Sequence, residues 1–261
     1  MLATKISAAI ITFNEERNIA RCLNSLDFVD EIIVVDSLSN DKTREIAQKM
    51  GATVIEQKFL GHIAQKQLAL EHCTHDWVIS LDADEEVSQE LRVSLLELIA
   101  KEDFAYDAYA LNRISYHLGR WIRYGGWYPD RKIRFFNKQK AHWGGYNPHD
   151  KVIVNGNVGR LKGDLRHYVF KDLRHNIDTN NSYSSIMAED MYRQGVKFSY
   201  TKLLLKPLGK FFEVYVYKRG FLDGMPGFII AVGASYSMFL KFAKLWELQK
   251  VLHRNDAPDK K

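Results

Sequence analysis

The chain has 261 residues, which suits one sizeable α/β domain or one domain with an appended arm. Its 46% hydrophobic and 26% charged residues are ordinary for a globular protein. Two cysteines, Cys22 and Cys73, exclude a disulfide framework and a CxxC metal site, and they favour a reducing, cytoplasmic setting. The opening stretch MLATKISAAIITF has one lysine and no small-residue cleavage site, so no signal peptide is expected.

The net charge of +5 is unevenly distributed along the chain. Residues 197–254 carry ten Lys and Arg against three Asp and Glu, a surplus of seven positive charges. A basic tail on a near-neutral domain predicts attraction to an anionic surface, either a membrane or a nucleic acid. The alternative is that these residues form a solvated charged face.

Apolar runs of buried-strand length alternate with helical patterns over the first hundred residues. The expected strands are 6–13, 31–36, 52–57 and 77–82. Four helices are expected between and after these strands. The first begins at an N-cap formed by Asn14, with Glu15 and Glu16 in its first turn. The second covers 40–51, the third the stretch around 63–70, and the fourth begins at Ser88. Strands separated by helices of this length predict a mostly parallel sheet covered on both faces.

The pattern changes after Phe104. Shorter strands are expected at 108–116, 132–137 and 151–154, among loops rich in glycine and aromatic residues, RYGGWYPDRK and HWGGYNPHDK. Such loops suit a substrate-binding half better than a second copy of the first half. A helix is expected over 178–195.

The last sixty residues form a distinct block that mixes basic, apolar and aromatic residues. Gly224 to Leu240 is a run of seventeen residues without a charge, interrupted by Pro226. A spanning helix needs roughly 20 apolar residues, so an in-plane or re-entrant membrane contact at 221–242 is favoured over a span, and a buried core helix is the alternative. The predicted domains are therefore 1–196, divided into a nucleotide-binding half (1–103) and an acceptor half (104–196), and a membrane-associating helical region (197–261).

Acidic residues gather where the fourth expected strand ends, in the stretch DWVISLDADEEVS. Asp82, Asp84, Glu85 and Glu86 repel one another, so solvent, a helix N-terminus or a metal ion should offset their charge. Asp82 and Asp84 alternate on an extended segment and can point at one ion, and Asp36 ends the second strand at the same edge of the sheet. Carboxylate oxygens suit Mg²⁺ or Mn²⁺, although such a triplet can also simply begin a helix.

Three segments, IITFNEERNIARCLNSL, EIIVVDSLSNDKT and WVISLDADE, resemble the nucleotide-binding half of the inverting family 2 glycosyltransferases, which have the GT-A fold. The match covers roughly residues 6 to 90. The resemblance implies that Asp82 and Asp84 form the DxD motif that contacts the ribose and holds a metal on the sugar-nucleotide diphosphate. It further implies that the following residues border the nucleotide: Thr12, Asn14, Glu15 and Asp36. Lys66 falls where related enzymes place a positive residue near the nucleotide, or it is an ordinary helix-surface lysine.

Transfer of a sugar from a nucleotide needs a metal ion to stabilise the departing diphosphate and a general base to deprotonate the acceptor hydroxyl. Asp150, in GGYNPHDK, is favoured as the base because related enzymes carry His-Asp or His-Glu after a similar stretch. Asp130, in GGWYPDRK, is the alternative base, or it forms an ion pair with Arg131 or Arg134. By the resemblance, His167 or His149 is a candidate third metal ligand; a structural role is the alternative for His167.

Basic and aromatic residues of the second half are further candidates for substrate contacts. Arg131, Lys132 and Arg134 can offset the charge of a diphosphate or of a phosphorylated acceptor. Four aromatic residues can either stack on sugar rings or belong to the core: Trp127, Tyr128, Trp143 and Tyr146.

The segments RYGGWYPDRKIRFF, GGYNPHD and FFEVYVYKRGFLDGMPGF are similar to those of bacterial lipopolysaccharide inner-core β-glycosyltransferases. This similarity implies a UDP-sugar donor, most simply UDP-glucose, and a heptose of the lipid-linked core as acceptor. It also implies a peripheral position on the cytoplasmic face of the inner membrane, with no nucleic-acid partner.

Two other functions compete with glycosyl transfer. A sugar-phosphate nucleotidyltransferase is disfavoured because no Gly- and Lys/Arg-rich loop follows the first strand. An inactive sugar-nucleotide-binding protein is disfavoured because the DxD motif is intact.

Overall fold

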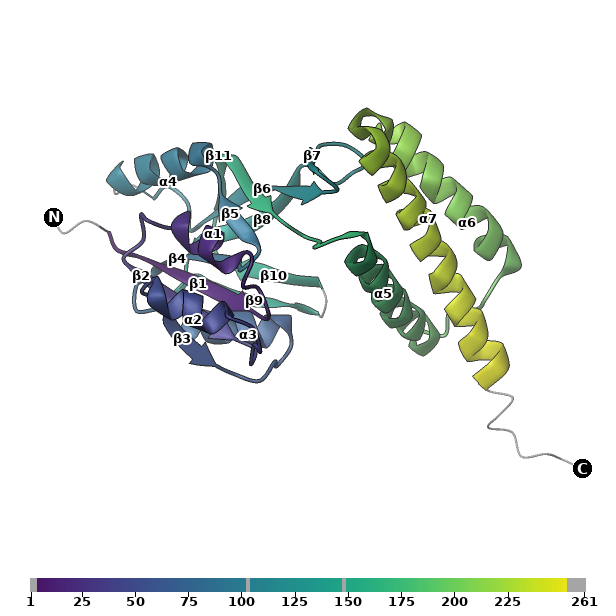
Figure 1. The fold of residues 1–261 in the computed structure, drawn as a ribbon, viewed down its shortest axis with the longest axis horizontal. Coiled ribbons are helices and arrows are strands. Elements are labelled where there is room, and N and C mark those ends of the chain that lie inside the picture. The colour runs from purple at the N-terminus through teal and green to yellow at the C-terminus, as the bar shows by residue number, and fades with distance from the viewer. Residues whose placement is uncertain (1–3, 102–103, 147–148, 253–261) are drawn as a thin grey trace, which may run out of the picture. The chain divides into compact units, whose positions relative to one another are not determined.

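The structure is a computed structural model that describes residues 4–101, 104–146 and 149–252 (Figure 1). The chain divides into two compact units. The first unit contains the residues up to Ile114 together with Pro129–Tyr168, and the second contains Ser115–Tyr128 together with the residues from Val169 onward.

The first unit begins with four parallel strands in the order β3-β2-β1-β4. These strands are β1 (Ile6–Thr12), β2 (Glu31–Asp36), β3 (Thr53–Glu56) and β4 (Trp77–Asp82). The helices that alternate with them are α1 (Ile19–Asn24), α2 (Thr43–Lys49) and α3 (His62–Glu71), and α4 (Gln89–Lys101) comes after β4. The four parallel strands predicted from the apolar runs are confirmed.

Side chains on the two faces of β1 enter two separate cores. Ile10 lies in a cluster with residues of α1, α2 and α4, whereas Ala9 lies in a cluster with Ala69 and Leu70 of α3. Because successive residues of a strand point to opposite faces, helices cover both sides of the parallel strands. The mixed α/β class with flanking helices, predicted from the sequence, is confirmed.

Further strands extend the sheet beyond β4, in the order β4-β8-β6-β11-β5, with antiparallel pairing of β4–β8, β8–β6 and β11–β5. They are β8 (Asp130–Asn137), β6 (Ala108–His117), β11 (Val158–His167) and the short β5 (Glu85–Val87), while β7 (Arg120–Ile122) pairs with the end of β6. A separate hairpin, β9 (Ala141–Tyr146) with β10 (His149–Val154), packs with α3 on the second face. Neighbouring strands are thus parallel throughout β1–β4, whereas β8 runs antiparallel to both β4 and β6.

The turn after β1 differs from the prediction. Asn14 does not cap α1, which begins five residues later at Ile19. Asn14 has a left-handed backbone (φ 54°), its Oδ1 accepts a hydrogen bond from Asn40 N at 2.9 Å, and Glu15 N donates to Thr43 Oγ1 at 2.8 Å. The loop after β1 is therefore held by hydrogen bonds to the loop after β2, a long-range arrangement that a local cap pattern cannot reveal.

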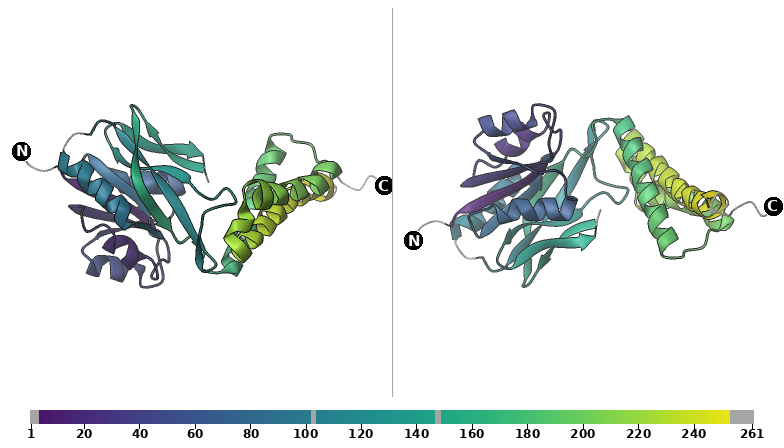
Figure 2. Two further views of the ribbon diagram at one scale, coloured as in Figure 1. Left: turned by 90° about the horizontal axis from the view of Figure 1, so that it is seen from above. Right: turned by 90° about the horizontal axis from the view of Figure 1, so that it is seen from below.

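The second unit is dominated by three helices, α5 (Leu173–Arg193), α6 (Tyr200–Phe212) and α7 (Gly224–Glu247). Figure 2 shows them as a bundle in which α7 packs against both α5 and α6. Two short π-helices, η1 (Glu213–Tyr217) and η3 (Leu248–Leu252), and a 3-10 helix, η2 (Gly220–Asp223), connect and extend them. The compact units separate at Tyr168 and not at residue 196, because α5 shares a core with α7 through Ala188, Phe242 and Leu245.

Candidate active site

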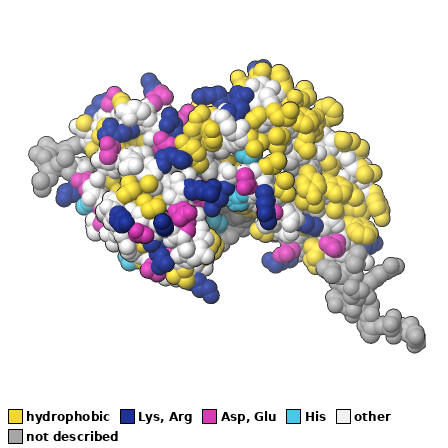
Figure 3. All heavy atoms as spheres, viewed as in Figure 1, with side chains coloured by type: hydrophobic (Ala, Val, Ile, Leu, Met, Phe, Trp, Pro, Cys, Tyr) yellow, Lys and Arg dark blue, Asp and Glu magenta, His cyan; other side chains and the backbone are white. Residues whose placement is uncertain are grey.

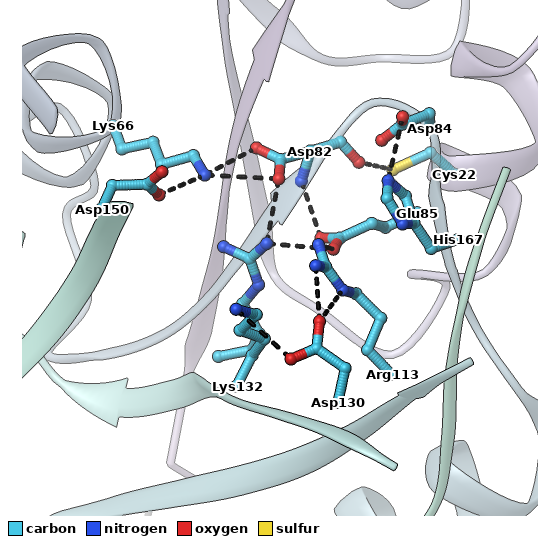
Figure 4. A network of polar contacts seen from close by, with 11 residues as sticks. Cys22, Lys66, Asp82, Asp84, Glu85, Arg113, Asp130, Lys132, Asp150 and His167 are labelled. Atoms are coloured by element: carbon cyan, nitrogen blue, oxygen red, sulfur yellow. Dashed lines mark hydrogen bonds and ion pairs between the residues drawn. The ribbon is translucent and has the colours of Figure 1, made fainter. Parts of the chain in front are cut away.

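The acidic residues at the end of β4 are offset by side-chain cations from three different elements (Figure 4). Lys66 Nζ of α3 lies 3.0 Å from Asp82 Oδ1, and Arg134 Nη2 of β8 lies 2.9 Å from Asp82 Oδ2. The same Arg134 nitrogen lies 2.9 Å from Glu85 Oε1, which Arg113 Nη1 of β6 also contacts at 3.1 Å. Side-chain cations, which were not among the expected offsetting groups (solvent, a helix N-terminus or a metal ion), therefore offset the charge of Asp82 and Glu85.

These cations keep two buried carboxylates ionised. Burial acts to raise the pKa of Asp82, but Lys66 and Arg134 outweigh it and hold that pKa far below its usual range. Burial likewise opposes ionisation of Glu85, and Arg134 and Arg113 keep its pKa below the ordinary value. Glu85 is also fixed by a hydrogen bond from Asp82 N to its Oε2 at 3.0 Å. The segment after β4 is thus a strand held by charge pairs, not the start of a helix.

Cys22 is not a nucleophile candidate, although it lies against this segment. Its Sγ lies 3.8 Å from the carbonyl oxygen of Asp82. Burial, and then the charges of Glu85 and Asp84, raise the pKa of the Cys22 thiol well above its usual value. The thiol therefore stays protonated at neutral pH.

Asp84 has a different environment from Asp82. Its Oδ2 lies 3.2 Å from His167 Nε2 at the end of β11, and its carbonyl oxygen accepts a hydrogen bond from Tyr168 N at 2.9 Å. Asp84 Oδ1 and His167 Nδ1 are both buried, and neither has a hydrogen-bond partner among the described residues. Buried polar atoms without partners are unfavourable, so this pair is suited to a ligand that completes their contacts.

The residues present fit a divalent cation that is bound partly by substrate. Within the described ranges, no three His, Cys, Asp or Glu side chains form a ready-made ligand group. Mg²⁺ and Mn²⁺ commonly bind through one or two carboxylates, with substrate phosphates and water completing the shell. Asp84, with His167 beside it, is that kind of donor set, whereas both oxygens of Asp82 already contact cations.

Lys66 joins the end of β4 to the hairpin that carries Asp150. Its Nζ lies 2.8 Å from Asp150 Oδ2 and 3.0 Å from Asp82 Oδ1, and it faces the Trp143 ring at 4.7 Å. Lys66 is only 4% exposed, so the alternative of an ordinary helix-surface lysine was wrong. Asp150 is thereby placed on the same ionic network as the acidic segment. The Asp150 side chain is 17% exposed, so it remains accessible to a substrate.

Asp130 has the surroundings of a structural ion pair. Arg113 Nη2 lies 2.6 Å from its Oδ2, and Lys132 Nζ lies 3.3 Å from its Oδ1. Burial raises its pKa, but Arg113 and Lys132 outweigh that effect and lower it. The ion pair foreseen with Arg131 or Arg134 forms instead with Arg113 and Lys132, and a carboxylate with a lowered pKa is a weaker base.

The residues expected to border the nucleotide lie at the carboxyl ends of β1 and β2. Thr12 is opposite Asp36 in the β1–β2 pairing, and Ile11 is opposite Asp82 in the β1–β4 pairing. Asp36 is fully buried and accepts hydrogen bonds from Ser39 N, at 2.8 Å, and from Ser39 Oγ. The backbone of Asn14 contacts the same Ser39 hydroxyl at 2.8 Å. This edge is a preorganised set of loops next to Asp82.

The remaining predicted contact residues are dispersed. Arg131 is exposed on β8, opposite Asn112. Trp143 is 5% exposed and belongs to the core beneath Lys66 and Arg134, so it is not a sugar platform. Trp127 belongs to the second unit, where it stacks on His117 with ring centroids 5.8 Å apart. The side chains of Tyr146 and His149 lie outside the described residues.

Arg134 is expected to stabilise the fold through the two carboxylates it bridges. Replacing it by Met leaves Asp82 and Glu85 with one cationic partner fewer in a buried setting, so the free energy of unfolding should fall by about 3 kcal/mol. Urea unfolding followed by circular dichroism measures the change. The matched control is Arg131→Met on the same strand, which is exposed and should change stability by less than about 0.5 kcal/mol. Equal stability of the two variants would show that the buried bridge contributes nothing.

Comparison with known proteins decides the family. The profile of glycosyl transferase family 2 matches residues 7–160, more than half of the chain. The chain belongs to glycosyl transferase family 2. An uncharacterised glycosyltransferase of Rickettsia typhi is 36% identical over 94% of this chain and 87% of its own length. The fold and family predicted from the three N-terminal segments are thus confirmed, and the chain is an enzyme of the glycosyltransferase class.

Two further similarities concern more specific proteins. The lipopolysaccharide core biosynthesis glycosyltransferase LpsC of Rhizobium meliloti is 29% identical to this family 2 chain, over 97% of this chain and 96% of LpsC. The crystal structure of S. aureus TarS residues 1–349 in complex with UDP-GlcNAc is 13% identical and has a TM-score of 0.49, covering 97% of this chain and 92% of that one. The LpsC similarity, which spans both chains, bears on the choice of substrate.

Proposed function

We propose that this family 2 enzyme is a metal-dependent inverting glycosyltransferase that moves glucose from UDP-glucose to a heptose of the lipopolysaccharide inner core. The observation that carries the proposal is the pair of carboxylates with contrasting surroundings near the end of β4. Among the described residues, Asp84 has a buried oxygen without a hydrogen-bond partner beside His167, whereas Asp150 contacts Lys66 and its side chain stays 17% exposed. Asp84 is therefore suited to bind a cation, and Asp150 is suited to act as the general base.

The chemistry assigned to these residues is a single displacement. Asp84, with His167 beside it, would hold Mg²⁺ or Mn²⁺, which when bound stabilises negative charge on the departing nucleoside diphosphate. Asp150 accepts the proton of the acceptor hydroxyl. The oxygen of that hydroxyl attacks the anomeric carbon while the bond from that carbon to the phosphate oxygen breaks. Attack from the far face inverts the configuration, so an α-linked donor gives a β-linked product.

The ionic network supports this division of roles. Lys66 holds Asp150 on the side of the acidic segment, and Lys66 and Arg134 keep Asp82 ionised and fixed. Thr12, Asn14, Glu15 and Asp36 form the adjoining edge, where the nucleoside would bind, because ligands of open parallel sheets bind outside the carboxyl ends of the strands. Arg131, exposed on β8, is available to an anionic substrate.

The acceptor is proposed from the similarity to LpsC, whose name assigns it to lipopolysaccharide core biosynthesis. A lipid-linked core acceptor requires the enzyme to work at a membrane surface. We therefore place it on the cytoplasmic face of the inner membrane as a peripheral protein, consistent with the basic and apolar composition of residues 197–254.

A donor screen tests the proposal. Nucleotide release is followed with UDP-glucose, UDP-galactose and ADP-heptose, each with intact and with delipidated core acceptors. We expect the fastest release with UDP-glucose, a β-linked product by the anomeric coupling constant, and loss of activity on chelation with EDTA that Mn²⁺ or Mg²⁺ restores. An α-linked product would overturn the inverting mechanism, and release that is independent of any core acceptor would overturn the acceptor assignment.

A further inference from the structure

The second unit exposes an extended apolar surface along α6 and α7. Figure 3 shows hydrophobic side chains gathered over these two helices. Leu204, Leu208 and Phe212 follow one another at four-residue spacing on α6, each about 60% exposed. On α7 the exposed residues include Met225, Val232 and Tyr236, which recur at helical spacing. Soluble monomers rarely expose a contiguous apolar patch of this kind, so the surface indicates a binding partner.

Lysines occupy the other side of α6 from this apolar row. Lys202, Lys206 and Lys210 occur at four-residue spacing, each two residues from a member of the row, so they form the polar face of the helix. Lys241 of α7 is near two of them: its pKa is lowered by burial and then by the charges of Lys210 and Lys206. Glu213, 3.0 Å from Lys210, is the one acidic residue between 197 and 222. The groups packed around Lys241 are therefore mainly cationic.

The packing of α7 decides between lying in a membrane and crossing it. The run Gly220–Lys250 is long and apolar enough to span a bilayer. However, α7 is packed against α5, where Lys244 Nζ binds Asn181 O at 2.6 Å and Ser184 Oγ at 2.8 Å.

The outer side of α5 carries exposed charges, among them Asp178, Glu189 and Arg193. A span would carry α5 into the hydrocarbon with these charges, which is costly. An in-plane position leaves α5 in water.

We propose that α6 and α7 dock in the plane of an anionic phospholipid bilayer, with the apolar surface at the boundary between headgroups and acyl chains and the lysines of the polar face attracted to the lipid phosphates. Amphipathic helices with basic residues on the polar face bind membranes in this way. A second copy of the chain is a poorer occupant, because both copies carry the same surplus of positive charge in residues 197–254. The inference rests on the proposed function, which supplies the membrane-bound substrate. It adds which surface of the protein meets the membrane and which lipid charge attracts it.

Vesicle flotation of the full chain tests the docking surface. We expect binding to vesicles of phosphatidylcholine with 30% phosphatidylglycerol, at least tenfold weaker binding to pure phosphatidylcholine, and release by high salt. Lys202→Gln with Lys206→Gln, and separately Leu204→Ser with Leu208→Ser, should each weaken binding about tenfold. The matched charge control is Lys140→Gln with Lys162→Gln, two exposed lysines of the first unit, which should bind as the unaltered chain does.

Other outcomes of the vesicle and light-scattering measurements would overturn the docking proposal. Equal binding to both vesicle types would exclude the anionic lipid, and resistance to alkaline carbonate extraction would indicate a span. Loss of a dimer in light scattering for the leucine variant, without vesicle binding by the unaltered chain, would assign the surface to a second copy. Transfer to a delipidated acceptor is measured in parallel and should persist in the variants. Failure of that transfer in the unaltered chain, with vesicle binding intact, would reject the proposed function and leave the docking surface standing.

Discussion

Replacing Asp84 by Asn is expected to lower the rate of sugar transfer by about three orders of magnitude while the fold stays intact. The substitution keeps the shape of the side chain and an oxygen beside His167 but removes the negative charge that would hold the cation. Because Asp84 Oδ1 has no hydrogen-bond partner among the described residues, the change breaks no contact made by that atom. Transfer rate, Mn²⁺ affinity by electron paramagnetic resonance and melting temperature are measured on the same preparation.

Glu86→Gln is the matched control for Asp84→Asn. Glu86 lies two residues further on and is held by Arg166 at 3.1 Å and by the Tyr168 hydroxyl at 2.8 Å, so its charge is already used by the protein. Its replacement should leave Mn²⁺ affinity unchanged. Full activity of Asp84→Asn would remove the cation from the mechanism, and a collapse of the melting temperature would show a structural role instead.

The parallel half of the fold could be predicted because its signals are local. Strands β1, β2 and β4 are buried on both faces and therefore read as continuous apolar runs, and Ser88 Oγ caps the following helix by accepting from Leu91 N at 3.3 Å, as expected. The half of the sheet beyond β4 could not be predicted in full. β11 reads as VGRLKGDLRH, which has no clear alternation, and β5 reads as a helix start because it is acidic. Their pairing, His167 opposite Glu85, joins residues far apart in the sequence.

In the candidate site, too, the residues could be predicted from the sequence but their pairing could not. Asp82, Asp84, Lys66, Arg134 and Asp150 were each predicted from the chain, and the structure brings Asp82, Lys66, Arg134 and Asp150 onto one network. The sequence cannot state which carboxylate pairs with which cation, because the partners come from α3, β8 and β10.

Arg113 and Glu85 were missed for a physical reason. Arg113 occurs in an ordinary strand pattern, and Glu85 is one of four neighbouring acids, so only their contact at 3.1 Å distinguishes them. The sequence contains a partial indication of these contacts, because the four acidic residues after β4 required positive charge nearby.

Replacing Asp150 by Asn is expected to lower kcat by a factor of about 10² to 10⁴ while the affinity for UDP stays unchanged. The amide keeps a polar contact to Lys66 but cannot accept the proton of the acceptor hydroxyl. Steady-state kinetics with the lipid-linked acceptor give kcat, and calorimetric titration with UDP gives the affinity. The separation of the two quantities matters, because Lys66 also contacts Asp82, and a disturbed Lys66 would weaken nucleotide binding as well.

Asp130→Asn is the matched comparison, because Asp130 is the other carboxylate that could act as base. Arg113 and Lys132 hold both of its oxygens and lower its pKa, so its loss should cost stability more than turnover. A large fall in kcat for Asp130→Asn, with Asp150→Asn active, would reverse the assignment of the base. The contrast follows from the surroundings of the two carboxylates: Arg113 and Lys132 lower the proton affinity of Asp130, whereas Asp150 contacts Lys66 and keeps part of its side chain exposed to the substrate.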